Sequence, residues 1–214
     1  LEIIKKDRYF RRYQYSMFSA GCGNMLIEAP LVYLVTRELQ ASYTMSIMLT
    51  MVVPFAVSLV ALPLWALYLD RVHVAQFRAR QSILWVLAQL LTLVGAYMGS
   101  LAWLMAGRFI MGIARGGGTL AWQLGHNDFA NPDQLSAYMG IHVTLTGVRG
   151  AIAPFLGMAL YIGVPTISWA GIGSAVFLIA ALISACAGVG FYRLFITLKK
   201  ADLIDVRART PDQT

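Results

Sequence analysis

Residues 43–69 read YTMSIMLTMVVPFAVSLVALPLWALYL, a stretch of 27 residues without a charged side chain. A transmembrane helix needs about 20 predominantly apolar residues to cross about 30 Å of hydrocarbon, so this stretch is long enough to span a membrane. The whole chain of 214 residues has the same character, because it is 58% hydrophobic, only 13% charged and has a mean hydropathy of +0.65. A soluble domain carries roughly 25% charged residues. The composition therefore excludes a soluble globular protein and predicts an all-α membrane protein surrounded by the lipid bilayer.

Apolar blocks of similar length lie on both sides of this stretch, and short polar or basic connections separate them. The six expected transmembrane helices are 13–35, 43–69, 81–99, 101–124, 137–162 and 166–196. They make one membrane domain over residues 13–196, preceded by an interfacial segment (1–12) and followed by a tail (197–214). No part of the chain is left for a separate soluble domain.

The basic residues predict the orientation of these helices, because short cytoplasmic loops retain Lys and Arg. Thirteen of the 17 Lys and Arg residues flank one side: Lys5, Lys6, Arg8, Arg11, Arg12, Arg71, Arg78, Arg80, Arg193, Lys199, Lys200, Arg207 and Arg209. Only Arg37 flanks the other side. Both termini are thus expected in the cytoplasm. The net charge of +7 is placed to oppose anionic lipid headgroups, and nucleic acid is not an expected partner.

Three short motifs occur in sequence on these blocks. The connection 66–80, ALYLDRVHVAQFRAR, contains the Asp70-Arg71 pair followed by Arg78 and Arg80. The fourth block contains Arg108-x-x-x-Gly112, and the fifth contains Pro154 and Gly157.

In this order, the motifs resemble those of the major facilitator superfamily of secondary transporters. The departures are Ala66, His73, Arg149 and Ala153, which stand where that family has glycines. The resemblance implies one six-helix half of that fold, built of 3+3 inverted repeats, in which Asp70, Arg71 and Arg78 belong to a gating loop.

The resemblance also implies a second six-helix bundle, either the missing half of the same chain or a second copy of this one. The opening residues 5–13, KKDRYFRRY, resemble the linker into the second half, which favours the C-terminal half. We expect a multi-pass protein of a bacterial cytoplasmic (inner) membrane.

Four ionisable residues fall inside the spans: Glu28, Arg108, Arg115 and Arg149. Such residues usually face a cavity or a partner. Glu28 and Arg108 each lie seven residues from the outer end of their span, so at about 1.5 Å per residue they share one depth and can pair. The pair is either a structural link between helices or contains a carboxylate that couples proton movement to transport.

Arg115 and Arg149 lie fourteen and thirteen residues from the outer ends of their spans, near mid-depth, where transporters of this type bind substrate. Polar residues recur on the same helical faces, which predicts a wet interior with a net positive charge. The candidate substrate-binding residues are Asn24, Arg115, Thr119, Trp122, His142, Thr146 and Arg149. The alternative for Arg115 is a hydrogen bond to helix-end carbonyls or to Asp128.

These observations favour a half-module of a secondary transporter that moves a small solute by alternating access, and the positive interior favours an anionic solute. The competing hypothesis is a non-transporting bundle, such as a receptor or an assembly subunit, in which the arginines only hold helices together. No catalytic framework, cofactor motif or set of metal ligands at suitable spacing accompanies the polar residues, so neither an enzyme nor a metal site is expected.

Overall fold

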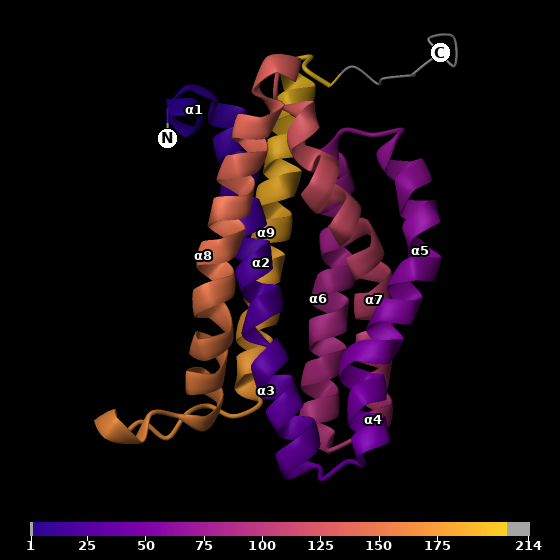
Figure 1. Cartoon of the computed structure of the whole chain (residues 1–214), viewed down its shortest axis with the longest axis vertical. Coiled ribbons are helices and arrows are strands. Elements are labelled where there is room, and N and C mark those ends of the chain that lie inside the picture. Colours follow the sequence, from indigo (N-terminus) through magenta and orange to yellow (C-terminus); the bar gives the residue numbers. More distant parts are fainter. Residues whose placement is uncertain (1, 205–214) are drawn as a thin grey trace.

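The computed structural model describes residues 2–204 and is a bundle of long helices (Figure 1). A short helix, α1 (Glu2–Lys6), precedes the first long segment. Within the described residues, six long helical segments follow one another: α2 (Arg8–Leu26) with α3 (Glu28–Tyr33) and π-helical η1 (Leu34–Glu38); α4 (Tyr43–Ile47) with π-helical η2 (Met48–Val52) and α5 (Val53–Leu69); α6 (Val74–Met98); α7 (Leu101–Leu124); α8 (Leu135–Ile162); and α9 (Ala175–Lys200).

Five of these segments, all except α7, are long and apolar enough to cross a membrane by length and composition. Helix α7 has 24 residues, which is also sufficient length. It is more polar because it carries Arg108 and Arg115. Its neighbours in the bundle are α5 and α6. The all-α membrane bundle expected from the sequence is confirmed.

The third helix begins earlier than the expected span. Helix α6 starts at Val74 because two side chains cap its first turn: His73 Nδ1 accepts the Ala75 N–H at 3.1 Å, and Asp128 Oδ2 accepts the Val74 N–H at 2.7 Å. Arg78, assigned from the sequence to a loop, therefore lies inside a helix.

The last helix begins later than expected. Residues 166–174, which lie within the expected transmembrane helix 166–196, form a turn, and α9 starts only at Ala175. Positive φ angles at Gly163, Ser168, Gly171 and Gly173 reverse the chain here, and the backbones of Val164 and Trp169 form an antiparallel bridge. The helix continues to Lys200, into the expected tail, of which residues 205–214 lie outside the described part.

The helix contacts contain an internal symmetry. Helices α6 and α9 pack against each other; α7 packs on α6 and α5, and α2 packs on α9 and α8. Exchanging α2 with α7, α5 with α8 and α6 with α9 reproduces the same set of neighbours. The contacts are therefore those expected of two three-helix repeats, α2–α5–α6 and α7–α8–α9.

The start of α2 and the end of α9 lie at the same end of the bundle, which we call the terminal end (Figure 1, top). The α5–α6 and α7–α8 connections also lie there, whereas the α6–α7 and α8–α9 connections lie at the opposite, distal end. An apolar core that includes Phe10, Phe77 and Phe191 fills the terminal half, and a second one that includes Leu49 and Leu104 fills the distal half.

Candidate solute and coupling site

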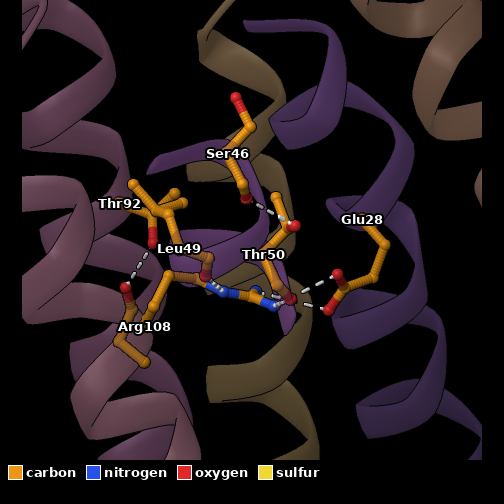
Figure 2. Close-up of polar contacts among 7 residues, drawn as sticks. Glu28, Ser46, Leu49, Thr50, Thr92 and Arg108 are labelled. Atoms are coloured by element: carbon orange, nitrogen blue, oxygen red, sulfur yellow. Dashed lines mark hydrogen bonds and ion pairs between the residues drawn. The ribbon is translucent and has the colours of Figure 1, made fainter. Parts of the chain in front are cut away.

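An ion pair joins Glu28, the first residue of α3, to Arg108 on α7 (Figure 2). Arg108 Nη2 lies 3.3 Å from Glu28 Oε2, and Nη1 lies 3.4 Å from Oε1. The Arg108 side chain is only 1% exposed, whereas the Glu28 side chain is 42% exposed. The structure thus brings together the two residues that the sequence places at one depth, with the guanidinium enclosed and the carboxylate accessible.

Backbone carbonyls of the second helical segment hold Arg108 independently of Glu28. Its Nε donates to the Leu49 carbonyl at 3.2 Å, and its Nη2 donates to the Thr50 carbonyl at 3.0 Å. Figure 2 shows the side chain running past both residues toward Glu28.

These two carbonyls lack backbone donors because Pro54 and a π-helical turn interrupt the helix. In an α-helix the N–H of residue 54 would bond Thr50, but proline has no N–H. The Val53 N–H bonds to Met48 in the π-helical pattern, which also leaves Leu49 without its usual donor. Arg108 therefore satisfies the carbonyls at an interrupted helix, an interaction that is not among those expected from the sequence.

A second polar group connects α2, α7 and α8. His142 Nδ1 lies 3.0 Å from Gln14 Oε1, and Trp122 Nε1 donates to Thr146 Oγ1 at 3.1 Å. The rings of Trp122 and His142 are 5.5 Å apart. Three of the predicted candidates, Trp122, His142 and Thr146, are thus in one cluster, and Gln14 belongs with them.

Arg149 lies on α8, one turn after Thr146, and is 6% exposed. Its guanidinium points to α2, where Nη1 donates to the Met17 carbonyl. It occupies the space beside Gly21, since a Cβ at that position would lie 2.2 Å from the guanidinium carbon. Arg149 Nε is buried without a hydrogen-bond partner among the described residues.

Arg115 and Thr119 are exposed on α7, where the Thr119 hydroxyl donates to the Arg115 carbonyl at 3.1 Å. Arg115 thus differs from the buried Arg149 in its access to solvent. Asn24 on α2 accepts a hydrogen bond of 3.0 Å from Gln89 of α6. Gln89 was not among the sequence candidates, although a buried amide within an apolar block is the signal that would have identified it.

The gating-loop residues are divided between two environments. Asp70 and Arg71 are exposed and line a pocket of about 450 Å³ at the terminal end, together with Asn127 and Asp128. Arg78 is buried in the bundle instead, donating to Gln81 at 2.6 Å and lying 5.1 Å above the Phe191 ring. Near the pocket, burial lowers the pKa of His126, which favours its neutral form.

Comparison with known families identifies the chain. Residues 15–211 match the family described as Major Facilitator Superfamily. The chain belongs to the major facilitator superfamily. No curated protein and no solved structure matched it.

Membership of the superfamily, with the apolar helices, makes the protein an integral, multi-pass membrane transporter. The transporter hypothesis from the sequence is therefore supported over a non-transporting receptor or assembly subunit. The family does not point to an enzyme.

Proposed function

We propose that this bundle forms one half of the transport pathway for a small anionic solute and moves against a second six-helix bundle by alternating access. The second bundle is either another part of the same polypeptide or a second copy of this chain. The proposal rests on family membership for transport, and on the charges inside the bundle for the class of solute.

The anionic class of the solute is inferred from an excess of buried positive charge. Arg108 and Arg149 are 1% and 6% exposed, and Glu28, the acid paired with Arg108, is 42% exposed. Arg149 contacts a backbone carbonyl and has no ion-pair partner within the described residues. A carboxylate or phosphate would supply charge-assisted, bidentate hydrogen bonds that a neutral solute cannot.

The residues proposed to contact the solute lie on three helices. Arg115 and Thr119 are accessible on α7, and the cluster of Trp122, His142 and Thr146 lies between α7 and α8. Asn24 and Arg149 complete the set on α2 and α8. In this proposal Arg149 exchanges its bond with the Met17 carbonyl for one with the solute.

Glu28 is the proposed coupling carboxylate. Its exposure gives protons access to it, and its bonds to Arg108 are long at 3.3 and 3.4 Å. Arg108 stays hydrogen-bonded to Leu49 and Thr50 when Glu28 is protonated. Protonation can therefore release Glu28 while Nε and Nη2 of the buried guanidinium keep their carbonyl partners.

The test is uptake into proteoliposomes by the transporter assembled with its second bundle. Small carboxylates and inorganic phosphate are the probes, with neutral sugars as the comparison. Because a hydrogen bond to a charged group contributes about 1.5–3 kcal/mol, Arg115→Ala and Arg149→Ala should each reduce anion affinity about 10-fold to 100-fold. Arg149→Lys keeps the charge but loses the planar fork, so its loss should be smaller than that of Arg149→Ala.

The matched control is Arg37→Ala, which removes an exposed arginine at the distal end. This control should leave affinity unchanged. Unchanged affinity for the transported anion in both Arg115→Ala and Arg149→Ala would contradict the proposed site.

A further inference from the structure

We infer that the α8–α9 connection, residues 163–174, is a membrane-interface anchor whose apolar side chains insert between the lipid headgroups and reach the acyl chains at the distal end of the bundle. The segment reads GVPTISWAGIGS and contains no charged residue. It is independent of the proposed solute site, because none of its residues belongs to that site.

The connection exposes apolar side chains where a connection in water would expose polar ones. Ile167 is 71% exposed, Trp169 is 36% exposed and Ile172 is 37% exposed. The uncharged stretch extends well beyond the turn, since the chain has no charged residue between Arg149 and Arg193. By contrast, the α3–α4 connection at the same end exposes the polar residues Gln40 and Ser42.

Hydrogen bonds fix the shape of this turn. The Val164 N–H donates to the Trp169 carbonyl at 2.8 Å, and the Trp169 N–H donates back to Val164 at 3.3 Å. At the base of the turn, the Ile172 N–H donates to the Leu160 carbonyl of α8 at 2.8 Å. A turn ordered in this way presents its apolar side chains with little further loss of conformational entropy on insertion.

Gly163 and Gly171 make the base of the turn possible. Both have positive φ angles, and a Cβ on either would lie within 2.5 Å of the backbone of the other strand. The close approach of the two strands leaves the side chains of Ile167 and Trp169 on the outside. The exposure of these two apolar side chains therefore follows from the close backbone contact between Gly163 and Gly171.

The position of the turn matches the edge of the bilayer. It joins the ends of two membrane-spanning helices, α8 and α9. Figure 1 shows the segment after α8 extending sideways from the distal end of the bundle. Tryptophan is enriched at this level of a membrane, where its ring is partly apolar and its N–H can meet water or headgroups.

Lipid is the occupant that these features favour. A sideways extension directs the turn into the plane of the surrounding membrane. The absence of Lys and Arg means that the attraction is apolar and does not require anionic lipid, unlike that of a polybasic segment. Insertion should thus occur equally in zwitterionic and anionic bilayers.

The test places a nitroxide label on Ile167→Cys in the full chain, with Cys22 and Cys186 replaced by serine, in phosphatidylcholine nanodiscs. Because Ile167 is 71% exposed, the label replaces no packed side chain. Collision with molecular oxygen, which concentrates in lipid, is compared with collision with a water-soluble nickel chelate. Gln40→Cys is the matched control in a polar connection at the same end.

We expect the label at residue 167 to be accessible to oxygen and protected from the nickel chelate, and the label at residue 40 to show the reverse. Adding phosphatidylglycerol should not change the result. Equal nickel accessibility at both positions would place the turn in water and overturn the inference. Exclusion of both reagents from residue 167 would show that protein covers the turn, and protection that appears only with phosphatidylglycerol would contradict the apolar mechanism.

Discussion

At the scale of single residues, Arg108 performs two tasks that separate substitutions can distinguish. It satisfies the Leu49 and Thr50 carbonyls, which Pro54 and the π-helical turn leave without backbone donors. It also pairs with Glu28, whose side chain is 42% exposed. The first task is a matter of stability, and the second is the one we propose to couple proton movement to transport.

We expect Arg108→Ala to destabilise the bundle by about 2–5 kcal/mol, because the buried Leu49 carbonyl and the partly buried Thr50 carbonyl lose their donor. Glu28→Gln should change stability by about 1 kcal/mol or less, since water can solvate the partly exposed carboxylate site. Thermal unfolding in detergent measures both. A larger loss in Glu28→Gln than in Arg108→Ala would contradict the assignment of Arg108 to the carbonyls.

Uptake by the same Glu28→Gln variant tests the coupling role separately. Solute exchange should persist, while accumulation driven by a proton gradient should be lost. Proton-driven accumulation equal to that of the unmodified transporter would make the Glu28–Arg108 pair a structural link only.

At the scale of helices, α2 and α8 approach closely at a point where α2 gives way to α3. Pro30 has no N–H, so the Leu26 carbonyl lacks the donor that a continuous helix would supply. Gly157 of α8 lies against this carbonyl, and a Cβ there would be 1.9 Å from the Leu26 oxygen. The glycine–proline pattern noted in the sequence of α8 is therefore partly explained by packing.

We expect Gly157→Ala to destabilise the bundle by about 1–3 kcal/mol, because the added methyl group forces α2 and α8 apart. Gly140→Ala, also on α8, is the matched control, since a Cβ at that position meets no atom within 4 Å. That control should be neutral or stabilise by up to about 1 kcal/mol. Equal unfolding temperatures of the two variants would show that the close contact with Leu26 does not contribute to stability.

At the scale of the whole molecule, the repeat symmetry and the position of the chain ends agree with six crossings. The start of α2 and the end of α9 lie at one end of the bundle. Arg71 belongs to the same end as these termini, and Arg37 lies in η1, at the distal end of the first crossing. That the terminal end faces the cytoplasm stays a prediction.

Single cysteines at these two arginines test that orientation, with Cys22 and Cys186 replaced by serine. A membrane-impermeant thiol reagent should label Arg71→Cys only from the cytoplasmic side, because Lys and Arg concentrate at the terminal end. It should label Arg37→Cys only from the opposite side. Labelling of the cysteine at residue 37 from the cytoplasm would reverse the predicted topology.

The sequence alone determined the membrane class, the approximate helix positions and the depth at which Glu28 and Arg108 lie. Apolar length is set by the thickness of hydrocarbon, and depth along a helix follows from its fixed rise per residue. Both quantities depend only on position along the chain. They could therefore be obtained without knowing how the helices pack.

Tertiary structure alone decided where α6 and α9 begin and which partners the buried arginines contact. Asp128 caps α6 from a distant connection, and the apolar turn before α9 has the hydropathy of a helix but the backbone of a loop. Arg149 turns to the Met17 carbonyl because Gly21 leaves space on the neighbouring helix. Arg108 reaches Leu49 and Thr50 because α7 packs beside the interrupted second helix. Such contacts depend on the rotation and distance of neighbouring helices, which periodicity within one helix does not encode.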